Sequence, residues 1–127
     1  MKKNAKRFSA FILTLVSGSN WQGNVPTNVG TATGNAPTLN ADYGVVTSAA
    51  LTTAAGGTAT ITVANSFVKA KSVVSVAISG GTNTAGTPLI ASAIPSAGSL
   101  VINIYNAHAT AAFNGTLAVS FNVLDSE

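Results

Sequence analysis

The sequence predicts an all-β fold, an antiparallel β-sandwich or jelly-roll-like domain with an extended N-terminal arm. A chain of 127 residues has the length of one ordinary domain. From residue 43 onward, apolar and polar side chains alternate with a period of two, and Gly, Pro and Asn separate these runs. No helical pattern is found after residue 40. We therefore expect an N-terminal strand or arm with an irregular segment at 1–42 and a sandwich domain at 43–127.

The chain begins with a basic stretch followed by a short apolar run. The four cations of the stretch are Lys2, Lys3, Lys6 and Arg7. The apolar run, Phe8–Val16, is too short to span a bilayer, which needs about 20 residues. This layout is that of a secretory signal. Retention of the segment in the mature chain is the alternative, and it is the one we expect.

If the run is retained, it must bury its apolar side chains. Both of its alternating faces are largely apolar, so a strand here would be covered on both sides. A helix would also carry an apolar stripe, but Phe, Ile, Thr and Val favour a strand. The strand would either be the first of the domain or an arm that docks on a partner. The candidate interface residues are the four cations together with Phe8, Phe11, Leu13, Leu15 and Trp21.

The stretch Gly18–Asp42 is rich in Gly, Pro, Asn and Thr and shows neither a strand nor a helix period. We expect an extended loop or arm here. Such a long irregular stretch is unusual inside a compact domain and more plausible along a neighbouring subunit. Trp21 lies in it. This side chain would either pack under its own domain or anchor an interface, where Trp is enriched.

The second part of the chain predicts a series of short strands. Their apolar residues alternate with Thr, Ser, Asn and Ala, so each should bury one face. The expected strands are Thr58–Val63, Ser72–Ser79, Pro88–Ile94, Leu100–Tyr105 and Leu117–Val123. Gly81–Gly86 is expected to connect two strands. We interpret Asn114-Gly115 as a hairpin turn, although with Thr116 it also fits a glycosylation signal.

Charged residues are only 7% of the chain, and they are concentrated at its start. After Arg7 the charges are Lys69 and Lys71 against Asp42, Asp125 and Glu127, which gives a net charge of 2 − 3 = −1. A nucleic-acid-binding face needs clustered cations, so we expect none. Sheet edges are normally protected by charges, and here that protection is missing. We therefore expect copies of the chain or other proteins to cover these strands.

The residues needed for catalysis or metal binding are scarce. The chain has no Cys, three carboxylates and one His, and it contains no Gly-x-Ser-x-Gly motif. His108 would need one of the few carboxylates beside it to form a triad, and we interpret it as a turn or interface residue. Gly81–Gly86 lacks the Lys that a phosphate-binding loop requires. We expect no enzymatic activity, no cofactor and no metal site.

Residues from about Ala49 to Leu124 resemble a small β-domain of virion proteins in tailed bacteriophages and other large DNA viruses. The segments that carry the likeness are Ala49–Thr58, Ile61–Ser66, Ile104–Thr110 and Phe113–Leu117. The resemblance implies a non-enzymatic structural protein of the particle, such as a capsid decoration or cement protein. The capsid-binding role of the N-terminal arm is our own inference from the residues.

The leading hypothesis is therefore a viral decoration protein on the outer surface of the capsid, which stabilises the head shell. Its expected partners are the major capsid protein and copies of itself, as a trimer or other homo-oligomer, with no nucleic acid and no membrane. The alternatives are a head- or tail-fibre component, a secreted appendage subunit that polymerises by strand exchange, and a carbohydrate-binding sandwich. The last is poorly supplied with aromatic side chains, since the chain has one Trp and two Tyr.

Overall fold

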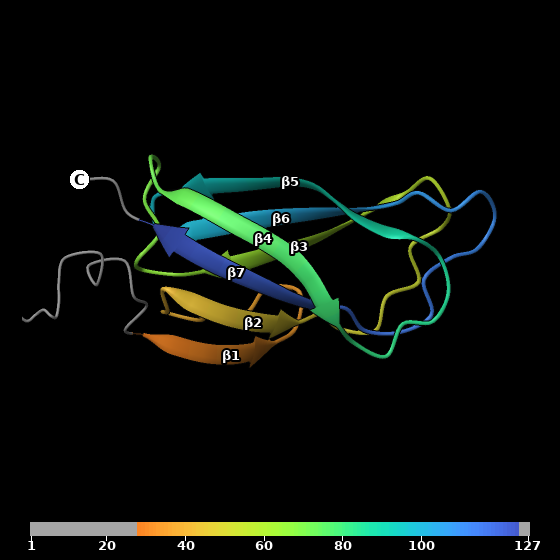
Figure 1. The fold of residues 1–127 in the computed structure, drawn as a ribbon, viewed down its shortest axis with the longest axis horizontal. Helices are drawn as coiled ribbons and strands as arrows, with labels where there is room; N and C mark the ends of the chain where they lie inside the picture. The colour runs from red at the N-terminus through yellow and green to blue at the C-terminus, as the bar shows by residue number, and fades with distance from the viewer. Residues whose placement is uncertain (1–27, 125–127) are drawn as a thin grey trace, which may run out of the picture.

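The computed structural model describes residues 28–124, and these residues form a two-layered β-sandwich (Figure 1). The prediction of an all-β sandwich is confirmed. The seven strands of the described part are β1 (Val29–Thr33), β2 (Tyr43–Thr47), β3 (Thr58–Ala64), β4 (Val73–Gly80), β5 (Pro88–Ser96), β6 (Ser99–Asn106) and β7 (Ala118–Leu124).

The strands are divided between a four-stranded and a three-stranded sheet. The order in the larger sheet is β1-β2-β7-β4, and in the smaller one β3-β6-β5. Strands β1 and β2 run parallel, whereas the other neighbours are antiparallel. The larger sheet is therefore mixed, because β1 and β2 are joined by a segment that crosses to the edge of the other sheet instead of by a hairpin.

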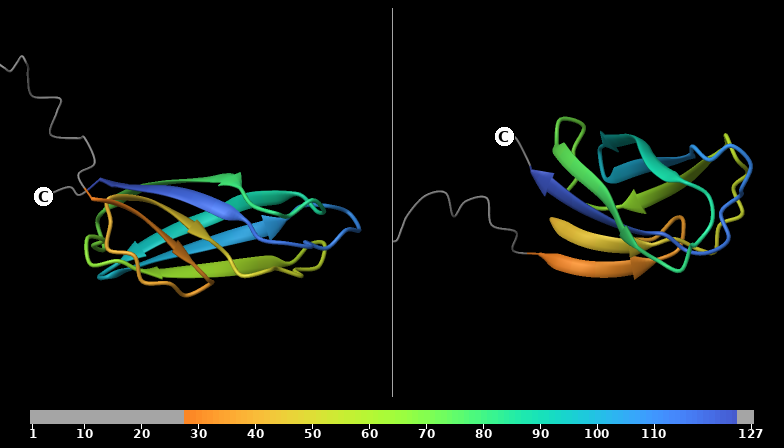
Figure 2. Two further views of the ribbon diagram at one scale, coloured as in Figure 1. Left: turned by 90° about the horizontal axis from the view of Figure 1, so that it is seen from below. Right: turned by 45° about the vertical axis from the view of Figure 1, so that its right-hand side comes forward.

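The core lies between the two sheets (Figure 2). Alternate residues of each strand point inward, and the central strands supply the most deeply buried side chains. Ile61 of β3 and Ile102 of β6 face Val119 and Phe121 of β7, and all four are at most 1% exposed. Burying such side chains stabilises the fold by about 1.5–3 kcal/mol each. The inward alternation predicted for these strands is confirmed.

The sandwich has two different ends (Figure 1). Strand β1 begins and β7 ends at one of them, which we call the terminal end. The β3–β4 connection and the β5–β6 hairpin lie there too. The opposite end, which we call the distal end, carries the connections 48–57, 81–87 and 107–117.

The five predicted strands are confirmed as β3 to β7, with bounds that differ by one or two residues. The expectation of an irregular stretch from Gly18 to Asp42 is wrong for Val29–Thr33, which form β1. The inward-facing residues of β1 are Gly30 and Ala32, so the strand shows no apolar period. A Cβ atom on Gly30 would lie 2.8 Å from the Leu39 side chain, which fills the space above it. A larger residue at this position would therefore require the Leu39 side chain to shift.

The hairpin interpretation of Asn114-Gly115 is also wrong. Strands β6 and β7 belong to different sheets, so no tight turn can join them. Instead, Oδ1 of Asn114 accepts hydrogen bonds from the backbone N–H groups of Thr84 and Ala85, at 2.8 and 3.2 Å. Asn114 therefore ties two distal loops together. The predicted strand connection at Gly81–Gly86 is confirmed, since it joins β4 to β5.

A fully buried amide holds the distal loops on the sandwich. Asn106, at the end of β6, is 0% exposed. Its Nδ2 donates to the carbonyl oxygens of Thr53 and Ala111, at 3.1 and 2.9 Å. Its Oδ1 accepts from the N–H groups of Thr87 and His108, at 3.0 and 3.1 Å. One buried side chain thus hydrogen-bonds to backbone groups of all three distal connections.

We predict that Asn106→Ala lowers the free energy of unfolding by about 3 kcal/mol, because it removes four hydrogen bonds made by a fully buried amide. Urea unfolding followed by circular dichroism measures this difference. Asn40→Ala is the matched control, since the exposed Asn40 amide accepts one hydrogen bond, from the N–H of Ser66. The control should lose less than about 1 kcal/mol. Equal losses for the two variants would contradict the role of Asn106.

Candidate protein interface

Charged side chains are confined to the terminal end in the part of the chain that the structure describes. Within residues 28–124 they are Asp42, just before β2, and Lys69 and Lys71, in the β3–β4 connection. These lysines lie just before β4. Neither sheet carries a charge on its strands between residues 28 and 124. The two broad outer faces of the sandwich are therefore electrically neutral.

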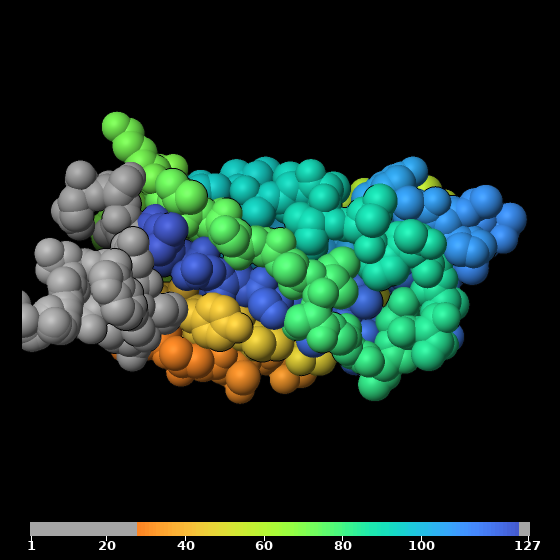
Figure 3. Space-filling model, viewed as in Figure 1, coloured from red at the N-terminus to blue at the C-terminus, as the bar shows by residue number. Residues whose placement is uncertain are grey.

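The outer face of the four-stranded sheet is a continuous surface of small, hydroxyl and apolar side chains (Figure 3). Val29 and Val73 are the most exposed large apolar residues on it, at 66% and 56%. The outward-facing residues of its strands are Val29, Thr31, Thr33, Tyr43, Val45, Thr47, Val73, Ser75, Ala77, Ser79, Ala118, Ser120, Asn122 and Leu124.

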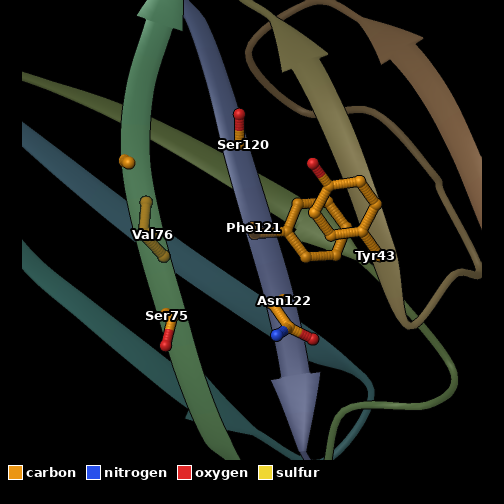
Figure 4. Close-up of a pocket in the computed structure, with 7 residues that line it drawn as sticks. Tyr43, Ser75, Val76, Ser120, Phe121 and Asn122 are labelled. Atoms are coloured by element: carbon orange, nitrogen blue, oxygen red, sulfur yellow. The ribbon is translucent and has the colours of Figure 1, made fainter. Parts of the chain in front are cut away.

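A groove of about 190 Å³ lies on this face, across β2, β7 and β4 (Figure 4). Small side chains form its middle, and Tyr43 stands at one side of it. Tyr43 and Ser75 are both register partners of Asn122, so the three residues form one row across the sheet. The residues that line the groove are Tyr43, Ser75, Val76, Ala77, Ser120, Phe121 and Asn122. The groove presents no charged group to an occupant.

Asn122 has an unsatisfied polar atom. Its Oδ1 is buried and has no hydrogen-bond partner among the described residues. Leaving a buried acceptor unpaired costs about 1–3 kcal/mol. A donor from a molecule that covers this face would remove that cost. The row Tyr43–Asn122–Ser75 is thus one place where the hydrogen bonding of this sheet is incomplete within residues 28–124.

The outer face of the three-stranded sheet is also uncharged, and one row of its polar side chains is joined by hydrogen bonds. The Thr60 hydroxyl donates to Oδ1 of Asn103, and Nδ2 of Asn103 donates to the Ser92 hydroxyl, both at 2.8 Å. These residues form one row across β3, β6 and β5. Leu89 and Ile94 lie on either side of this row, each 51% exposed. Within residues 28–124, no buried polar side-chain atom of this face lacks a hydrogen-bond partner.

His108 is a turn residue, as predicted. Its Nδ1 accepts hydrogen bonds from the N–H groups of Thr110 and Ala111, at 3.0 and 2.9 Å. The ring therefore stabilises the turn in the 107–117 connection. No group of three or more metal-ligating side chains comes together within residues 28–124. The described part of the chain also contains no helix that is long and apolar enough to cross a membrane.

The predicted interface residues lie outside the described residues. They are Lys2, Lys3, Lys6, Arg7, Phe8, Phe11, Leu13, Leu15 and Trp21. Sequence reasoning did not single out Tyr43 or Asn122. A signal was present, because Asn is depleted in strands and Asn122 interrupts the face between Ser120 and Leu124. That signal could not show whether the amide has a partner.

No family model, curated protein or solved structure matches this chain.

We predict opposite effects when the two outward-facing strand asparagines are replaced. Asn122→Val removes an unpaired buried acceptor, so the free energy of unfolding should rise by about 1 kcal/mol. Asn103→Val is the matched control on the other sheet, and it breaks two hydrogen bonds. The control should be less stable than Asn122→Val by about 1–2 kcal/mol in urea unfolding. Equal stabilities would show that the Asn122 amide has a partner in the free protein.

Proposed function

We propose that the protein is a structural subunit of a virus particle, a capsid decoration or cement protein that binds the outside of the head shell and stabilises it. The observation that carries the proposal is the absence of charge from both outer sheet faces between residues 28 and 124. The proposal agrees with the resemblance of Ala49–Leu124 to a β-domain of virion proteins.

Neutral outer faces suit a protein that works in a fixed assembly. The cores of protein interfaces are depleted of charge, because hydroxyl, amide and small apolar groups can be covered without removing charges from water. A free domain with so few charges has little electrostatic repulsion to keep it soluble. Such a surface is a disadvantage for a lone molecule, and it is suited to tight packing against neighbours.

The two ends of the sandwich support an orientation on the shell. The terminal end carries all three charged residues of the described part, Asp42, Lys69 and Lys71, and the described chain begins there. Residues 1–27 precede this point and include four cations. The uncharged distal loops lie at the opposite end. In this proposal the terminal end faces the major capsid protein and the distal loops face outward.

The proposed partners are the major capsid protein and copies of the chain itself. Closed cyclic symmetry is the general rule for homo-oligomers, and a trimer would match a local three-fold position of a capsid. The protein acts by contact in this proposal, with no cofactor and no catalytic step. Asp42 and His108 are the residues of the described part best suited to acid–base chemistry, and they lie near opposite ends of the sandwich.

We predict that the full chain binds empty shells of the virus that encodes it and raises the temperature at which they dissociate. Removal of residues 1–16 should weaken this binding at least tenfold, because the four cations of this segment supply the anchor. Binding is measured by co-sedimentation with shells stripped of the protein. The dissociation temperature is measured by light scattering.

Matched charge variants control the experiment. Replacing Lys2, Lys3, Lys6 and Arg7 by Ala should weaken binding, whereas replacing Lys69 and Lys71 by Ala should have a smaller effect. Undiminished binding after removal of residues 1–16 would exclude the arm from the mechanism. Failure of the full chain to bind the shells would contradict the decoration function. Antibody labelling at one vertex or at the tail alone would instead support a fibre component.

A further inference from the structure

The edge of the larger sheet at β1 is open. The N–H of Tyr43 donates to the carbonyl oxygen of Asn28 at 3.2 Å, and the N–H of Gly34 donates to that of Thr47 at 2.8 Å. Because backbone groups alternate along a strand, those of Asn28, Gly30, Ala32 and Gly34 point toward β2. The N–H and C=O groups of Val29, Thr31 and Thr33 therefore point away from the sheet. Within residues 28–124, no strand lies beyond them.

The other sheet edges are shielded, at least in part. The 34–42 segment covers half of β3, where the N–H groups of Thr62 and Ala64 donate to the carbonyl oxygens of Asn35 and Pro37. Strands β4 and β5 lie alongside each other where the two sheets meet (Figure 1). Native proteins usually protect an open edge with charged residues or proline, and β1 has neither. Its outward residues, Val29, Thr31 and Thr33, are β-branched and favour strand pairing.

We propose that the β1 edge binds the apolar run Phe8–Val16 of a second copy of this chain as an added strand. The run is rich in β-favouring residues and is uncharged, and it contains neither glycine nor proline. Addition of such a strand would pair the outward backbone groups of β1. The inference concerns contacts between copies of the protein and does not depend on binding to a shell.

A second copy fits better than the same chain because both faces of the run are apolar. A strand added at β1 continues the sheet, so its inner face would lie toward the core. Its outer face would continue the neutral outer face of the sheet, which nothing covers within residues 28–124. Strands that are apolar on both faces are normally buried on both. A neighbouring copy that both donates and receives a run can provide the second cover.

The length of the chain permits this exchange. Ser17–Asn28 connects the run to β1 and can extend to about 40 Å. The described chain begins beside β1, since Val29 is the register partner of Tyr43. The connection to the run therefore starts at the edge where the exchange would occur. Two copies can then exchange runs reciprocally, or each can pass its run to the next copy.

Disulfide trapping in the full chain tests the proposal, because the natural chain has no cysteine. One chain carries Thr33→Cys, and a ¹⁵N-labelled chain carries Cys at each position of Phe8–Val16 in turn. The two are mixed and oxidised, and mass spectrometry counts the mixed pairs. A paired strand presents every second side chain to the same face. The yield of mixed pairs should therefore rise and fall with a period of two residues, at least fivefold between neighbouring positions.

Thr60→Cys is the matched acceptor control, because Thr60 is an exposed threonine on β3 of the other sheet. It should give low yields without a period. Equal, aperiodic yields with Thr33→Cys and Thr60→Cys would overturn the proposal. A further chain carries Thr33→Cys together with one cysteine in the run. Disulfides that form only within this chain, and not between chains, would also overturn the proposal, because the run would then pair with β1 of its own molecule.

A proline variant tests the edge separately. The N–H of Thr31 points away from β2, so Thr31→Pro removes a donor that the fold does not use but that an added strand needs. In the Thr33→Cys background, Thr31→Pro should lower the yield of mixed pairs at least tenfold while the unfolding midpoint stays near that of the parent chain. An unchanged yield in a folded Thr31→Pro chain would contradict strand addition.

Discussion

The shortage of charge outside the terminal end is the constraint on which the rest of this structure depends. The core of aliphatic side chains with Phe113 and Phe121 specifies which face of each strand is buried. The other faces carry Thr, Ser, Asn, Ala and a few large apolar residues, and within residues 28–124 no charged strand residue keeps neighbouring molecules away. Folding therefore buries the apolar side chains between the two sheets. The uncharged outer faces that remain are suited to contact with protein.

The outer faces of the two sheets differ in their hydrogen bonding. On the three-stranded sheet, the Asn103 amide is bonded on both sides within its own face. On the four-stranded sheet, within residues 28–124, the Asn122 amide leaves an acceptor unpaired beside a groove, and β1 leaves backbone groups unpaired at the edge. Both unsatisfied features belong to the same sheet, and residues 1–27 join the described chain at this sheet. The larger sheet is therefore the better candidate for contact with copies of the chain or with a partner.

The sequence was sufficient to predict much of the fold. Alternation in segments such as Leu100–Tyr105 identifies strands and their inner faces directly, because one buried face requires a period of two. Strand β1 was missed because Gly30 and Ala32 make its inner face small. Asn114-Gly115 was misinterpreted because a dipeptide carries local turn propensity but does not show to which sheet each neighbouring strand belongs.

The candidate interface was harder to predict from the sequence than the fold. Low charge indicated that protein would cover the strands, but not which face or edge. That distinction depends on whether Asn122 and Asn103 find partners, and on which strand is last in its sheet. Both are properties of pairing between strands that are distant in the sequence. The neighbours of Asn122 across the sheet, Tyr43 and Ser75, are separated from it by dozens of residues.

Sedimentation equilibrium of the full chain, from micromolar to millimolar concentration, tests the central claim most directly. If other copies of the chain cover the neutral faces and the open edge, the average molecular mass should rise with concentration toward a defined oligomer. High salt should not reverse this rise, because few charges take part in the contacts. A single-copy species that persists to millimolar concentration would contradict the account.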